Sequence, residues 1–239
     1  MINQALITLC GTAAVIGFTH TLIGPDHYLP FIMLGKANKW TLSKTVVITI
    51  LCGIGHVLSS IVLGAIGVGF GIAVNKLVNI ESVRGEIAFY LLTGFGLAYS
   101  IWGIRYALRH RQHEHRHAHD QEHQPHDHSH SHLSGHSHLH QGNPTTIWTL
   151  FIIFVLGPCE PLIPLVMYPA IMHNWYGVTA VAIVFGIITI TTMTSIVWLA
   201  YRGIEKVSPA RTNWLEKWSH ALAGIAIASS GLVIKLFGL

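Results

Sequence analysis

The chain has 239 residues, of which 51% are hydrophobic and only 10% are charged, and its mean hydropathy is +0.51. Soluble domains carry roughly 25% charged residues, so this composition excludes an ordinary soluble protein and indicates a membrane protein. The formal net charge of +4 is small, and it gives no indication of a surface that binds nucleic acid.

Apolar segments are long enough to cross a hydrocarbon layer of about 30 Å when they contain roughly 20 helical residues. Six segments meet this requirement, and they occupy residues 4–34, 45–74, 87–107, 145–172, 177–201 and 219–238. We therefore predict an all-α membrane protein with six transmembrane helices.

The basic residues indicate an orientation in the membrane. If successive connections alternate sides, eleven of the fourteen lysines and arginines follow the first, third and fifth segments. Basic residues concentrate in cytoplasmic loops, so we expect both termini outside and the long loop over 108–144 in the cytoplasm.

The two halves of the chain resemble each other. A shift of 133 residues aligns "GPDHYLP" at 24–30 with "GPCEPLI" at 157–163 and places Gly53 on Gly186. Because each half contains three predicted spans, the second half would run opposite to the first, as in many secondary transporters. We expect two inverted three-helix repeats over residues 1–107 and 145–239, joined by the loop over 108–144.

Two Gly-Pro pairs, Gly24-Pro25 and Gly157-Pro158, interrupt the first span of each half. Broken membrane helices are tolerated where the freed backbone groups line a cavity, and transporters bind substrate at such breaks. The sequence therefore predicts a binding site where the two breaks meet.

The first half places ionisable residues at and near its break. His20 and His27 flank Asp26, and Cys52 and His56 lie four residues apart on one face of the second span. Imidazole with a carboxylate and a thiolate suits Ni, Co or Zn. The alternative is structural, with the histidines as hydrogen-bond partners between helices and Asp26 as a helix cap.

The second half offers fewer candidate ligands. Glu160 is the only acid in its span, and we interpret it as a second carboxylate ligand, a proton carrier or a structural cap. Cys159 is a candidate soft ligand, although buried membrane cysteines more often serve packing.

Thirteen of the eighteen histidines lie between residues 110 and 140. This segment has no apolar face, so we expect it to be disordered, and its composition is typical of metal binding at several exchangeable sites. A pH-sensitive linker is the alternative interpretation.

The motifs "HTLIGPDH" and "GIGHVLSS", with the His-rich loop between the third and fourth spans, resemble the NicO nickel/cobalt transporter family. Its wider group includes urease-accessory-like, sulfite-exporter-like and thiol-transporting cytochrome-biogenesis proteins. The resemblance implies an inner-membrane (plasma-membrane) permease of bacteria that moves Ni or Co, with His20, Asp26, His27 and His56 at the matching positions. The family pattern has four residues between its first histidine and the aspartate, whereas this chain has five.

These features favour a secondary transporter that exports a divalent transition metal. The expected ion is Ni or Co, with Zn as the further candidate. No nucleophile-base pair, phosphate loop or ATP motif occurs, so we expect neither an enzyme nor a prosthetic group. The expected partners are the metal ion and the lipid bilayer, without nucleic acid.

Two other functions remain as alternatives. One is a sulfite-type anion exporter, in which the positive ends of half-helices face the substrate. The other is a membrane relay of thiols or reductant through paired cysteines. The internal alignment opposes such a pair, because Asp26 occupies the position that matches Cys159.

Overall fold

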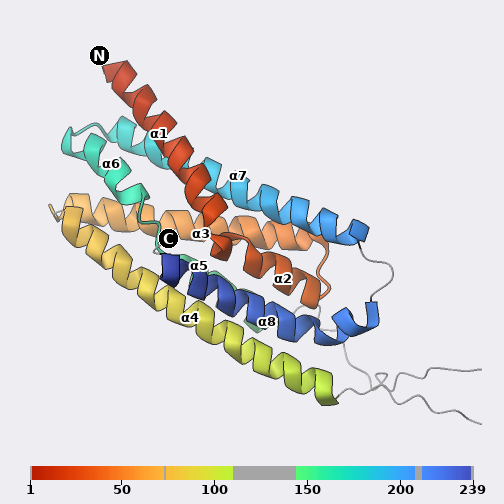
Figure 1. Cartoon of the computed structure of the whole chain (residues 1–239). Helices are drawn as coiled ribbons and strands as arrows, with labels where there is room; N and C mark the ends of the chain where they lie inside the picture. The colour runs from red at the N-terminus through yellow and green to blue at the C-terminus, as the bar shows by residue number, and fades with distance from the viewer. Residues whose placement is uncertain (1, 73, 110–143, 208–211, 238–239) are drawn as a thin grey trace, which may run out of the picture.

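The computed structural model describes residues 2–72, 74–109, 144–207 and 212–237 (Figure 1). These residues form helices only: α1 (Ile2–Ile23), the short 3₁₀ helix η1 (Pro25–His27), α2 (Leu29–Ala37), α3 (Leu42–Gly69), α4 (Val74–Arg109), α5 (Pro144–Leu156), α6 (Leu162–Ile171), α7 (Trp175–Val207) and α8 (Thr212–Phe237). The predicted all-α class is confirmed. The thirteen histidines of the 110–140 segment lie outside the described residues.

Four of the described helices are long and apolar enough to cross a membrane, namely α1, α3, α4 and α7. Helices α5 and α6 are apolar but shorter, with 13 and 10 residues. The chain is thus a multi-pass membrane protein, while the count of six spans stays a prediction.

Both Gly-Pro pairs break their helices as predicted. Helix α1 ends at Ile23, and Gly24 has the extended backbone conformation (ψ 97°) that the residue before a proline favours. Pro25 then occupies the first turn of η1, where the missing N–H costs no hydrogen bond. In the second half, α5 ends at Leu156 and α6 begins at Leu162.

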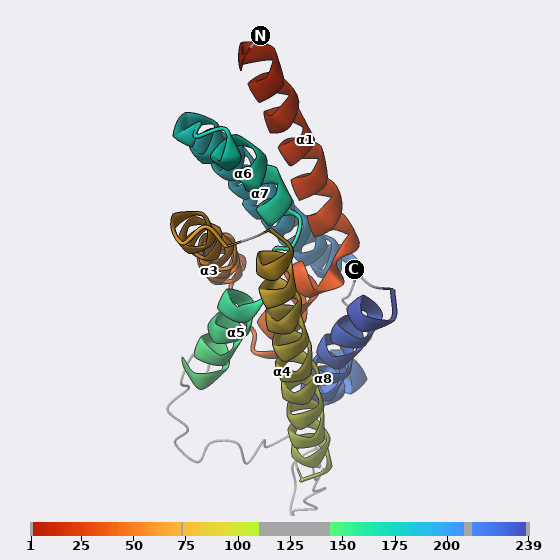
Figure 2. The same cartoon turned by 90° about the vertical axis from the view of Figure 1, so that its left-hand side faces the viewer.

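Helices α4 and α8 lie side by side and run in opposite directions (Figures 1 and 2). Small residues allow this approach. A Cβ atom on Gly96 would lie 2.5 Å from the backbone nitrogen of Ala228, and one on Gly224 would lie 2.3 Å from that of Ser100. Close backbone contact through glycine is typical of helix pairs in membranes.

The remaining helices pack around the two breaks. Helix α1 contacts α7, and α3 contacts α5, α6 and α7. One buried cluster contains Phe31, Cys52 and Phe154, and a second contains Cys159, Leu162 and Phe185. The folded chain therefore surrounds both breaks with helices from its two halves.

Candidate functional site

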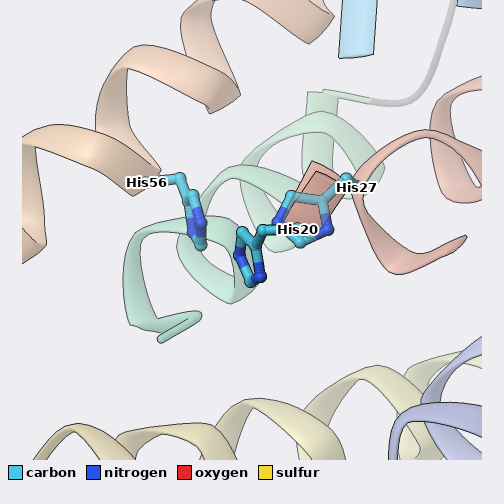
Figure 3. Close-up of side chains that lie close together, drawn as sticks. All are labelled: His20, His27 and His56. Carbon is cyan, nitrogen blue, oxygen red and sulfur yellow. The ribbon is translucent and has the colours of Figure 1, made fainter. Parts of the chain in front are cut away.

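Three histidines from three different elements meet at the first break (Figure 3). His20 comes from the last turn of α1, His27 from η1 and His56 from the middle of α3. One ring nitrogen of each lies within 4.8 Å of the others. The ring centroids of His20 and His27 are 4.8 Å apart, and those of His27 and His56 are 5.3 Å apart. We call these three residues the histidine cluster.

Hydrogen bonds define which ring nitrogens of His27 and His56 accept. Nδ1 of His27 lies 2.9 Å from Asp26 Oδ1 and 3.2 Å from the Gly24 carbonyl oxygen, and Nδ1 of His56 lies 3.2 Å from the Phe154 carbonyl oxygen. All three partners are acceptors, so each Nδ1 carries a proton and donates it. In a neutral imidazole the other nitrogen then offers a lone pair.

The Nε2 atoms of His20, His27 and His56 are buried, and none of them has a hydrogen-bond partner among the described residues. A buried polar atom without a partner costs free energy, on the order of 1–3 kcal/mol. The lone pairs on Nε2 of His27 and His56, with the unpartnered Nε2 of His20 beside them, therefore indicate a binding site for a group that is electron-poor, such as a hydrogen-bond donor or a cation.

The cluster lines a cavity of about 660 Å³. Helices α1, α3, α4, α5 and α8 and both breaks contribute to its wall, which includes the apolar side chains of Ile16, Phe89, Leu92 and Ile153. Its volume lies within the range of about 300–1,000 Å³ that is typical of sites for small molecules. The cavity is the place in the described structure where both breaks meet the histidine cluster.

Charged residues also line this cavity. Lys235 of α8 forms an ion pair with Glu86 of α4, with 2.7 Å between Nζ and Oε1, and both side chains are about half exposed. Glu160, which lies in the second break, is exposed and lines the same cavity. The cavity thus combines acceptor nitrogens with charges of both signs.

The predicted site residues divide into two groups. His20, Asp26, His27, His56 and Glu160 all line the cavity, and the first four lie together. Cys52 and Cys159 are buried in the two different apolar clusters, and both are free thiols. Neither contributes to the histidine cluster. Their packing follows from the ordinary preference of free cysteine for apolar interiors.

A buried ion pair on α4 was missed by the sequence analysis. Glu81 is fully buried, and its Oε1 atom lies 2.5 Å from Nη1 of Arg84. Arg84 also donates to the carbonyl oxygens of Val155 (2.9 Å) and Gly157 (3.3 Å), at the end of α5. The Cys159 N–H donates to Oε2 of Glu81 at 3.2 Å. The pair therefore satisfies backbone groups that the second break leaves free.

Two serines complete this network. Nη2 of Arg84 donates to Ser59 Oγ at 2.8 Å, and Nη1 lies 3.5 Å from Ser60 Oγ, both on α3. The signal in the sequence was an acid and a base three residues apart in an apolar context, "NIESVRG". The predicted third span began at residue 87, which placed both residues outside the membrane, whereas α4 begins at Val74.

Comparison with known proteins gives one family. Residues 29–233 match the family described as the cytochrome C biogenesis protein transmembrane region. No curated protein and no solved structure matches the chain.

This match corrects the sequence-based assignment. The resemblance to the NicO nickel/cobalt family is wrong, because the matched family is a cytochrome c biogenesis family from the wider group. The predictions of nickel and cobalt transport, and of a divalent metal ion as the transported partner, are wrong for the same reason. The short histidine motifs alone therefore did not separate the matched family from the NicO family. The match spans most of the chain, which therefore belongs to the cytochrome C biogenesis protein transmembrane region family.

Proposed function

We propose that this protein is a membrane relay of thiols or reductant that carries reducing equivalents across the bilayer. The observation that carries the proposal is the family match over residues 29–233, whose description refers to cytochrome c biogenesis. Reduced thiols are the chemical form in which two electrons pass between proteins or small molecules by thiol-disulfide exchange.

The cavity supports a relay in which something is bound within the membrane. It lies at two helix breaks, and broken helices in inverted repeats are a common way to form a binding site inside the bilayer. Each half of the chain has a broken helix followed by two long helices. We infer from this order, together with the internal alignment, that the two halves are inverted repeats with six spans in total.

The orientation and the domain division belong to the same proposal. Both termini lie outside the inner membrane, the loop over 108–144 lies in the cytoplasm, and residues 1–107 and 145–239 form the repeats. The distribution of lysine and arginine supports this orientation. The protein acts as a carrier without a catalytic step of its own and without a prosthetic group.

The histidine cluster and Asp26 bind the transferred group in this proposal. The unpartnered Nε2 atoms of His27 and His56 are acceptors, which disfavours an anion such as sulfite, the other alternative considered. The assignment of His20, Asp26, His27, His56, Glu160, Cys52 and Cys159 as metal ligands stays a prediction, for which the convergence of the three imidazoles is the only geometric support among the described residues.

The proposal is tested with the purified full chain in sealed vesicles. The vesicles contain a trapped aromatic disulfide whose thiolate product is coloured, and the reductant is added outside. Two external thiols are oxidised to one disulfide, and the two electrons cleave the internal disulfide to two coloured thiolates. Two reductants are used in separate experiments, reduced thioredoxin as a protein dithiol and L-cysteine as a small thiol.

We expect coloured thiolate to form inside vesicles that contain the protein, faster than in vesicles of the same lipid without it. If neither reductant raises the rate above that of protein-free vesicles, the relay function is wrong. Vesicles that contain the His220→Gln protein serve as a matched control, because His220 contacts Tyr99 and does not line the cavity.

A further inference from the structure

The cysteines of this chain lie away from the cavity where a transferred group would bind. The residues that the structure describes around the cavity include no cysteine. Cys52 and Cys159 are almost completely buried in separate apolar clusters, and Cys10 is partly buried at the edge of the second. Thiol-disulfide exchange needs a thiolate that reaches the other sulfur. Reducing equivalents that pass through this cavity must therefore be carried by the ligand.

We propose that the cavity binds an amino-thiol, a small molecule with a primary ammonium group and a thiol, and that the ammonium group binds the histidine cluster. This inference rests on the proposed function, because the thiol belongs to the ligand only if reductant is transferred. The ligand would range in size from an amino acid to a short peptide.

The geometry of the cluster matches a primary ammonium group. Such a group has three N–H donors at tetrahedral angles, and the cluster offers a lone pair on Nε2 of His27, on Nε2 of His56 and, in the tautomer with its proton on Nδ1, on Nε2 of His20. Donor-acceptor distances of about 2.9 Å at these angles separate the three acceptors by roughly 4.7 Å. One ring nitrogen of each of His20, His27 and His56 lies within 4.8 Å of the others, a spacing that allows three hydrogen bonds to one nitrogen.

Asp26 supplies the opposite charge. Its carboxylate accepts the Nδ1 proton of His27, and its side chain is 28% exposed and lines the cavity. An ammonium group taken out of water needs such compensation, because burial of an unpaired charge is costly. The negative charge one residue from the cluster favours a cationic group over a neutral donor.

The rest of the cavity suits the thiol end of such a molecule. Phe89, Leu92 and Ile153 form apolar wall, and a thiol behaves as a small hydrophobic group with a weak donor. Lys235, which also pairs with Glu86, lies on the same cavity and carries the positive charge that a ligand carboxylate needs. A molecule with an ammonium, a thiol and a carboxylate therefore finds a partner for each group.

Binding is measured by isothermal titration of the purified full chain, with a chelator present so that no metal ion contributes. The probes are L-cysteine, cysteamine, which lacks the carboxylate, and N-acetyl-L-cysteine, in which the amine is blocked. We expect L-cysteine and cysteamine to bind and N-acetyl-L-cysteine to bind at least tenfold more weakly. Equal affinity for L-cysteine and N-acetyl-L-cysteine would overturn the inference, and this comparison requires no variant.

Variants test whether L-cysteine binds at the histidine cluster. Asp26→Asn keeps the size of the side chain, and we expect it to weaken L-cysteine binding by about tenfold because one charge is lost. His220→Gln should leave binding unchanged. An unchanged affinity in Asp26→Asn would contradict the inference.

The vesicle experiment separates this inference from the proposed function. A protein in which Cys10, Cys52 and Cys159 are all replaced by alanine should still transfer reducing equivalents from L-cysteine, and thioredoxin should not drive transfer. If thioredoxin drives transfer and the cysteine-free protein is inactive, the relay function stands and the amino-thiol inference fails. If no reductant gives transfer, the relay function itself fails.

Discussion

The two helix breaks look alike in the sequence, but different interactions hold them in place. The first break is held mainly by its own segment, because His27 and Asp26 bond to each other and His27 also bonds to Gly24. The second break is held by a distant helix, because Arg84 and Glu81 of α4 bind the backbone of Gly157 and Cys159. The comparison indicates that the second break has a structural role, because α4 holds its backbone in place. The first break leaves its polar side chains available for a ligand.

The largest expected effect is on the free energy of unfolding, and it concerns the second break. Glu81→Ala leaves the Arg84 guanidinium without its carboxylate in a buried setting, and loss of one partner of a buried pair typically costs about 3–5 kcal/mol. We expect a correspondingly lower free energy of unfolding, measured by thermal or denaturant unfolding in detergent. Glu86→Ala, which removes an exposed ion pair, is the control and should leave the melting temperature unchanged.

The next effect distinguishes the contribution of the Arg84 charge from that of its planar geometry at the second break. Arg84→Lys keeps the positive charge but loses the planar group that reaches carbonyl oxygens of Val155 and Gly157 as well as Glu81. We expect destabilisation of about 2 kcal/mol, since each lost hydrogen bond to a charged donor contributes about 1.5–3 kcal/mol and Lys recovers part of it. Stability equal to that of the unchanged protein would show that charge alone holds the break.

The third prediction compares the glycines of the two breaks. A Cβ on Gly24 would lie 2.6 Å from Nδ1 of His27 and 2.8 Å from Oδ1 of Asp26, so both side chains must move. A Cβ on Gly157 would lie 3.1 Å from Nδ1 of His56, which requires a shift of only a few tenths of an ångström. We expect Gly24→Ala to lower the rate of transfer into vesicles by about tenfold or more, and Gly157→Ala to lower it less. Equal rates in the two variants would contradict the comparison.

The smallest effect concerns the rim of the cavity. Glu86→Gln removes the charge that pairs with Lys235, although both side chains are about half exposed. Exposed ion pairs contribute little and are screened by salt. We therefore expect no measurable change in melting temperature and a change in transfer rate that disappears at high salt. A rate change that persists at high salt would indicate a contact between Glu86 and the transferred molecule.

Several features of the fold were predictable from local patterns. Gly-Pro pairs break helices for a steric reason that acts within a few residues, and both breaks occur where "GPDH" and "GPCE" placed them. The convergence of His20, His27 and His56 was also expected, because a kink between the first two and a neighbouring helix for the third allow it.

Other features depend on which helix faces which, and a single sequence does not determine that. Cys52 lies one turn from His56, yet it packs into the apolar cluster with Phe31 and Phe154. Glu81 and Arg84 were excluded because an acid and a base lower the hydropathy of a window, while in the fold each neutralises the other. The transported species could not be deduced from histidine motifs, since acceptor nitrogens bind cations and hydrogen-bond donors alike.

The close backbone packing of α4 against α8 limits how the molecule can change shape. Their backbones approach too closely at Gly96 and Gly224 for even one added methyl group, so these helices cannot slide or rotate against each other without steric collision. They form a rigid helix pair that joins the first half of the chain to the second. An opening toward one side of the bilayer then requires that other helices move against this pair.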